Sequence, residues 1–194
     1  YVNPRYEGFC IMTETRLLHR NTLPLELKTL LLDYPKSDWQ GHPNFSDFSE
    51  FWLQRHTMFR EIGMRLIHLS QSMLNKDIEA REYQRQIFGY SEFMLHQLHT
   101  HHMMEDTYFF PEIGKNDTKT QTAIELLESD HIEIGRLIHD YTASLQQCST
   151  PTLTSTKADT LLSLQSVFNT ALTQHLDDEE EIIVPAALHF GYIR

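Results

Sequence analysis

Apolar residues recur at steps of three and four along four long stretches of this chain, and that periodicity restricts the fold more than any other feature. Such steps place side chains on one face of a helix, which must be buried against a neighbour. The predicted helices run over about 47–74, 77–110, 117–148 and 155–185. Short connections force successive helices to run antiparallel. We therefore predict an all-α fold, an up-down-up-down antiparallel four-helix bundle, with a coiled-coil dimer as the alternative.

The ends of these helices and the segment before them carry local signals. Asp47 and Glu50 have the spacing of a capping box, which begins a helix. Pro111 and Pro185 are expected to end the second and fourth helices, because proline lacks the N–H that a helix interior needs. Residues 1–44 hold four prolines and are predicted to form an irregular N-terminal arm, with a short helix possible from Leu25 to Leu32. The bundle domain is then predicted over residues 45–194.

Charge and composition exclude several classes of partner. The 194 residues include 16 Lys and Arg against 27 Asp and Glu, a net charge of −11. Nucleic acid and anionic membrane surfaces repel such a chain, so neither is an expected partner. No apolar run approaches the roughly 18 residues that suggest a membrane span. Two cysteines, Cys10 and Cys148, make no disulfide framework, and we expect a cytoplasmic protein.

A repeated motif ends the second and fourth helical stretches. His101 and Glu105 are four residues apart, as are His175 and Glu179, and each motif is followed by a second acid. In both copies a proline comes six residues after the glutamate. Residues four apart lie one above the other on a helix face, so a histidine and a glutamate at this spacing reach the same point.

The two remaining stretches each add one inward histidine. His56 precedes His101 by 45 residues, and His131 precedes His175 by 44. The chain therefore reads as two copies of a helical hairpin. Each copy supplies one lone histidine and one His-x-x-x-Glu motif.

Four imidazoles and two carboxylates meeting inside a bundle indicate a metal centre. Unpaired, such groups would cost several kcal/mol each to bury. Two divalent cations would satisfy them, each held by two imidazoles, with the carboxylates bridging. Imidazole and carboxylate suit iron, zinc or manganese, and the lack of thiolate argues against structural zinc or an iron–sulfur cluster. The predicted metal ligands are His56, His101, Glu105, His131, His175 and Glu179.

Other interpretations stay open for single residues. Any one inward histidine is more often an ordinary core residue than a ligand. His102 is an alternative to His101, because it lies three residues from Glu105. Asp106, Asp130 and Glu180 neighbour the predicted ligands and would be able to orient imidazole N–H groups, although exposed positions are the simpler expectation. The carboxylate-rich ferritin-type pattern and the zinc-protease motif His-Glu-x-x-His are absent from the sequence.

With these motifs the sequence resembles the haemerythrin-like (HHE cation-binding) family over about residues 46–190. The resemblance implies a di-iron centre in a four-helix bundle. In the oxygen-carrying members a fifth histidine occupies the position of Gly135, and the last motif is His-x-x-x-x-Asp. The set found here is more similar to that of bacterial di-iron repair proteins and of an iron-sensing ubiquitin-ligase subunit. The repair proteins carry an N-terminal cysteine-bearing region, whereas the arm here offers only Cys10.

The resemblance leads to a function expected of the metals. We expect a non-haem di-iron protein that reacts with or senses oxygen, nitric oxide or peroxide, with O2 or NO as a small diatomic ligand. Two iron ions are the expected cofactors, and zinc, manganese or nickel are possible substitutes. An iron-binding or redox signalling module is one alternative, and a di-iron oxidase of a small organic substrate is another. A metal-binding or sensing protein is favoured over a substrate-specific enzyme.

Overall fold

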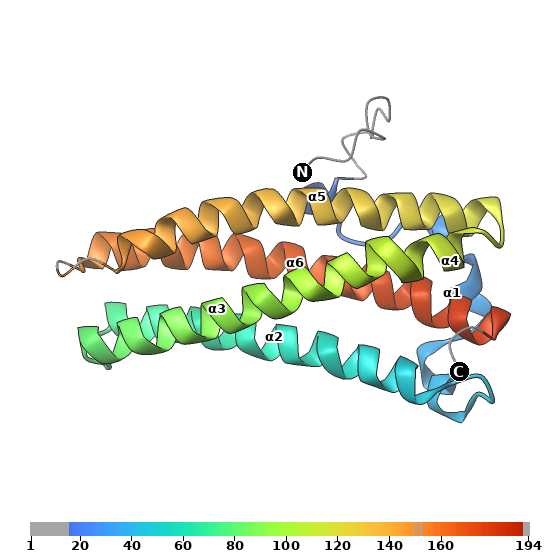
Figure 1. The fold of residues 1–194 in the computed structure, drawn as a ribbon, viewed down its shortest axis with the longest axis horizontal. Coiled ribbons are helices and arrows are strands. Elements are labelled where there is room, and N and C mark those ends of the chain that lie inside the picture. The colour runs from blue at the N-terminus through green and yellow to red at the C-terminus, as the bar shows by residue number, and fades with distance from the viewer. Residues whose placement is uncertain (1–15, 150, 152, 192–194) are drawn as a thin grey trace.

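The structure is a computed structural model that describes residues 16–149, 151 and 153–191. Four long helices lie side by side in a bundle (Figure 1), and the described residues include no strand. None of the helices in this part of the chain is long and apolar enough to cross a membrane. The all-α prediction is therefore confirmed. The long helices are α2 (Asp47–Leu74), α3 (Ala80–Met104), α5 (Thr118–Gln147) and α6 (Ser155–Phe190).

Hydroxyl and carboxylate caps begin three of these helices. The Ser46 hydroxyl accepts a hydrogen bond from the backbone N–H of Ser49 at 3.4 Å, so Ser46 caps α2 and the predicted cap at Asp47 is wrong by one residue. Asp47 and Glu50 instead lie in the first turn, where negative charge complements the helix dipole. Asp117 and Thr154 cap α5 and α6 in the same way as Ser46.

The predicted stop at Pro111 is wrong. After α3 the chain continues through a π-helical turn, η6 (Glu105–Phe109), into α4 (Phe110–Gly114). The Phe110 N–H reaches back five residues to the Glu105 carbonyl, as a π-turn requires. Pro111 then falls in the first turn of α4, where a missing N–H disturbs helical hydrogen bonding least.

The predicted stop at Pro185 is also wrong. Helix α6 runs through this proline to Phe190 and ends at Gly191, which has the left-handed φ of 71°. Seven consecutive residues around the proline, 182–188, are buried. The N-terminal arm packs on this end of α6, as Trp39 does on Val184 and Leu188. Burial on all sides offsets the one hydrogen bond that proline removes.

The described part of the arm, residues 16–44, consists of short helices laid against α5 and α6 (Figure 1). Its elements are η3 (Leu17–His19), η4 (Leu25–Leu27), α1 (Thr29–Asp33) and η5 (Lys36–Gly41). The predicted helix at Leu25–Leu32 corresponds to η4 and α1 together. Leu17, Leu23 and Trp39 are buried and anchor the arm. Cys10 lies outside the described residues.

Two large apolar clusters lie on either side of a polar layer, and a third, smaller cluster joins Trp39 of the arm to α6. Helices α2, α5 and α6 contribute to both large clusters, whereas α3 contributes to one and the following α4 to the other. On α5, for example, Leu127 belongs to one cluster and Ile134 to the other, with His131 between them. The same order holds on α2, where Trp52 and Phe59 flank His56. Apolar packing on both sides therefore holds a band of buried polar groups in the bundle interior.

Candidate metal centre

All six predicted ligands lie together in this polar layer. They come from every long helix of the bundle and from the π-turn, and each is at most 9% exposed. Nε2 of His56 on α2 is 3.1 Å from Nε2 of His101 on α3. Nε2 of His131 on α5 is 3.2 Å from Nε2 of His175 on α6. The imidazoles thus meet as two pairs, one from each hairpin.

The two carboxylates lie between these pairs. Glu105 places Oε1 2.8 Å from His101 Nε2 and Oε2 3.4 Å from His131 Nε2. Glu179 places Oε1 3.5 Å from His56 Nε2 and Oε2 3.5 Å from His175 Nε2. Each carboxylate therefore offers one oxygen to each histidine pair, which is the arrangement that two bridged cations require.

Glu105 reaches this position from the first residue of the π-turn. A π-turn changes the direction of the side chains that follow it, and such turns are frequent at functional sites. Here the turn begins at the glutamate of the first His-x-x-x-Glu motif, whereas the second motif lies within the regular helix α6. The two motifs, alike in sequence, are thus presented by different local backbones.

His102 joins the centre beside His101 and does not replace it. Its ring stacks on that of His131, with centroids 3.9 Å apart, and a nitrogen from each of His102, His131 and His175 falls within one possible metal-binding group. The other group contains one ligand atom from each of His56, His101, Glu105 and Glu179.

Helix geometry explains why the sequence leaves His101 and His102 as alternatives. Neighbouring residues on a helix point about 100° apart, so a single inward face admits only one of them. A centre divided into two halves receives both, His101 in one group and His102 in the other. Gly135, at the position matched to the fifth histidine of the oxygen-carrying members, is exposed, and no described heavy atom lies within 4 Å of a Cβ placed there.

Several polar atoms of the centre have no hydrogen-bond partner among the described residues. They are both carboxylate oxygens of Glu105, Oε2 of Glu179 and Nε2 of His102. The nearby imidazole nitrogens approach the oxygens without hydrogen-bond geometry. Buried carboxylate oxygens left in this way are strongly unfavourable. Imidazole nitrogen and carboxylate oxygen are the donor set of first-row transition metals, so these residues fit a pair of such cations.

The pKa values of the metal-free centre reflect its crowding. Burial, with repulsion from Glu179, raises the pKa of Glu105 well above its usual value. Burial also opposes ionisation of Glu179, but attraction to His56 and other imidazoles lowers the pKa of this carboxyl below its usual value. Burial lowers the pKa of His101 to about 3. The two carboxylates thus resist being charged together unless positive charge lies between them.

The family model of the Hemerythrin HHE cation binding domain matches residues 47–187. The chain belongs to this family. The matched range covers α2, α3, α5 and all but the last three residues of α6, and it includes every residue of the centre described above. Neither the comparison with curated proteins nor that with solved structures found a match. This haemerythrin domain is accordingly a cation-binding helical domain.

Acids behind the imidazoles orient two of the hairpin histidines in this haemerythrin domain. His56 Nδ1 is 3.0 Å from Glu180 Oε1, and His131 Nδ1 is 2.7 Å from Asp106 Oδ1. A carboxylate at Nδ1 fixes the tautomer that leaves Nε2 free to bind a metal. Asp106 is 46% exposed, as the sequence suggested, but Glu180 is only 12% exposed.

A third acid lies behind His175. Its Nδ1 is 3.4 Å from Oδ2 of Asp130, a residue of α5 that is 2% exposed. On the other side of the centre the indole N–H of Trp52 donates to Glu179 Oε1 at 2.6 Å. The exposed positions expected for Asp130 and Glu180 are therefore wrong, and their orienting role is the one the contacts support.

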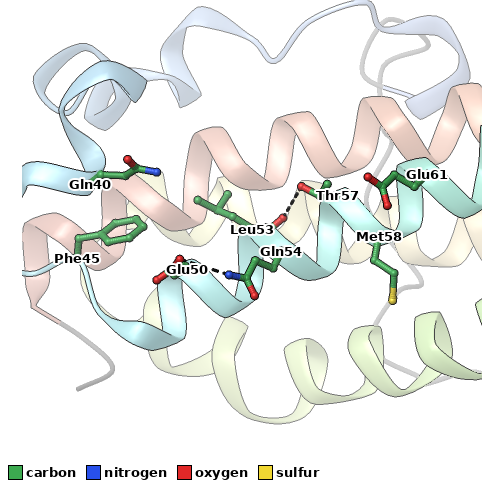
Figure 2. A pocket seen from close by; sticks show the side chains of 8 residues that line it. All are labelled: Gln40, Phe45, Glu50, Leu53, Gln54, Thr57, Met58 and Glu61. Carbon is green, nitrogen blue, oxygen red and sulfur yellow. Dashed lines mark hydrogen bonds between the residues drawn. The ribbon is translucent and has the colours of Figure 1, made fainter.

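Three surface grooves lie away from the ligands. A groove of about 300 Å³ runs along the outer side of α2, where Gln40 and Phe45 face Leu53 and Thr57 (Figure 2). Two others, of about 210 and 550 Å³, lie against the arm. None of the six predicted ligands lines any of the three. A bulky substrate in these grooves would not touch the centre.

The remaining histidines described by the structure lie outside the centre. His68, His96, His99 and His139 are exposed on the long helices. His189 lies near the C-terminal end of α6, where its Nδ1 is 3.1 Å from the Tyr34 hydroxyl.

Proposed function

We propose that this haemerythrin domain holds two iron ions and uses them to react with or sense oxygen, nitric oxide or peroxide. One observation carries the proposal: two carboxylates, buried and without hydrogen-bond partners at three of their oxygens, each lie between two pairs of imidazoles. An ordinary core does not retain such groups. Cations of the iron type match their number and chemistry.

The residues divide between two ions in this proposal. His56 and His101 would hold one ion, and His131 and His175 would hold the other, with Glu105 and Glu179 bridging. His102 would add a third imidazole to the second ion. Zinc, manganese or nickel would compete for the same ligands, because cellular supply rather than intrinsic affinity decides occupancy.

The chain's own residues would control what reaches the centre. When bound, a pair of iron ions supplies reversible one-electron chemistry that the imidazole and carboxylate side chains of the centre do not provide. The apolar clusters on both sides of the polar layer would exclude bulk water, while small apolar gases would pass between their side chains. The acids behind His56, His131 and His175 hold the imidazole tautomers in place.

The position of the grooves favours small ligands over organic substrates. An oxidase of an organic molecule needs a pocket beside its metals, and the three grooves are lined by other residues. An iron-dependent signalling module stays a second candidate. It is favoured by the arm, which touches the bundle next to the centre.

The order of the helices, the domain boundaries and the location of the protein are also proposed. We infer the up-down-up-down order from the short connections and from the course of the four helices in Figure 1. We infer an N-terminal arm over 1–44 and a bundle over 45–194. A cytoplasmic location is supported by the small number of cysteines, two in 194 residues.

The test is the optical response of the loaded protein. Protein reconstituted anaerobically with ferrous iron is mixed in separate samples with oxygen, nitric oxide and hydrogen peroxide. We expect a change in the visible spectrum with at least one of them. The zinc-loaded protein is the control, because zinc binds the same ligands without redox chemistry. An iron-loaded protein whose spectrum stays unchanged with all three would contradict the proposal.

A further inference from the structure

The arm places one guanidinium group deep between two bundle helices. Arg20 follows η3 and is only 5% exposed. Leu17 before it and Leu23 after it are 1% and 2% exposed, and each belongs to a different apolar cluster of the core. The segment is therefore fixed at two points, with the arginine between them.

Arg20 binds one acid from each of two helices. Its Nε donates to Oδ2 of Asp178 on α6 at 2.8 Å. Its Nη1 donates to Oδ1 of Asp130 on α5 at 3.1 Å, and Nη2 donates to Oδ2 of the same carboxylate. Both acids are 2% exposed. A guanidinium that binds both oxygens of Asp130 fixes the direction of that carboxylate and also compensates its negative charge.

Asp130 is also the acid behind a predicted metal ligand. Its Oδ2 lies 3.4 Å from Nδ1 of His175, whose Nε2 faces the centre. A continuous line of contacts thus runs from the arm through Asp130 to His175. The acid behind His56 is held mainly from within the bundle, because Arg60 donates to Glu180 at 2.9 Å, whereas the arm residue Lys36 only approaches it, at 4.0 Å.

We propose that Arg20 is a positioning residue of the metal centre and that docking of the arm and retention of metal are coupled. The inference rests on the proposed metal binding. Without the guanidinium, Asp130 and Asp178 become two neighbouring buried carboxylates that repel each other. The Asp130 carboxylate is then no longer held in the direction that orients His175. By linkage, a metal held through His175 in turn stabilises the docked arm.

Release of metal from matched variants tests the positioning role. Arg20→Met keeps the length and removes the charge, Arg20→Lys keeps the charge and removes the fork, and Lys28→Met removes an arm residue that pairs with Glu181 at the surface. Each full-length protein is loaded with cobalt(II) and mixed with excess chelator. We expect about tenfold faster metal release from Arg20→Met than from the wild-type protein. The release rate of Arg20→Lys should lie between the two, and that of Lys28→Met should equal the wild-type rate. The visible cobalt spectrum of Arg20→Met should also shift.

Two results would overturn the inference. One is a wild-type release rate in Arg20→Met, and the other is equal acceleration in Arg20→Met and Lys28→Met, which would reflect general loosening of the arm. Either result leaves the proposed metal binding intact, since the wild-type protein still holds its ions. Failure of the wild-type protein to bind cobalt or iron would instead reject the metal centre, and this inference with it.

Hydrogen exchange in the wild-type protein tests the coupling without any substitution. The backbone N–H groups of His19 and Arg20 both donate to the Arg16 carbonyl, so their exchange reports on docking of the arm. We expect several-fold slower exchange at these amides in the metal-loaded protein than in the metal-free protein. Equal exchange in the two forms would contradict the coupling, even if Arg20→Met does not fold.

Discussion

His102 stacks on His131 with ring planes only 13° apart, whereas its neighbour His101 lies with His56 in the other half of the centre. The two halves of the centre are therefore unequal in imidazoles. One half has His56 and His101, and the other adds His102 to His131 and His175. Two ions bound there would differ in ligand number even though the sequence motifs of the two hairpins match.

Replacing His102 should affect one ion more than the other. In His102→Ala we expect one of the two ions to be released at least about tenfold faster, while the second keeps its wild-type rate. His99→Ala is the matched control, because His99 lies exposed on the same helix. Release kinetics of cobalt or zinc to a chelator give the two rates. Identical biphasic release in His102→Ala and wild-type protein would show that His102 is only a packing residue.

The helices were predictable because their signal is repeated many times. Residues such as Phe59, Leu127 and Leu172 recur at helical spacing, and each is buried as the periodicity requires. The continuation through Pro111 and Pro185 was not predictable from local rules. It depends on a π-turn in one case and on packing of the arm in the other, and neither follows from the rule that proline ends a helix.

The residues of the centre that belong to the sequence repeat were predictable. The duplicated His-x-x-x-Glu motif and the two lone histidines identified six residues that the structure brings together. His102 and Arg20 occur once each and have no counterpart in the repeat. Contacts between Arg20 and Asp130 join residues 110 positions apart, and nothing in the spacing of the arm signals them.

The burial of two carboxylates makes a prediction about the metal-free protein. Glu105→Gln removes a group whose pKa is raised by burial and by Glu179, so the metal-free variant should be more stable than wild type. A gain of about 1 kcal/mol would raise the unfolding temperature by roughly 2–4 °C for a chain of this size. Thermal unfolding in excess chelator measures the difference.

The same substitution should weaken metal binding, because one bridging oxygen is lost. Glu112→Gln is the control, since Glu112 is 58% exposed and should change neither property. A metal-free Glu105→Gln protein that unfolds below the wild-type temperature would indicate that the carboxylate stabilises the fold by itself. In that case the centre would not need cations to offset its charge.

The indole N–H of Trp52 should slow metal release by holding Glu179 in place. Trp52→Phe keeps an aromatic ring but removes the donor to Glu179 Oε1, which leaves that oxygen freer to turn. We expect metal release several-fold faster than in wild type and a stability loss of about 1–2 kcal/mol. Trp39→Phe loses a similar indole hydrogen bond, to the Tyr34 carbonyl in the arm, and is the matched control. Equal release rates in the two variants would argue against a role for Trp52 at the centre.

The central claim is that six buried residues hold two metal ions, and metal analysis after anaerobic iron reconstitution tests it most directly. The full-length protein should retain close to two iron ions per chain after removal of free metal. His101→Ala and His175→Ala should each lose the pair, whereas His96→Ala, which changes an exposed residue of α3, should keep it. Fewer than one ion per chain in the wild-type protein, or an unchanged content in His101→Ala and His175→Ala, would contradict the account.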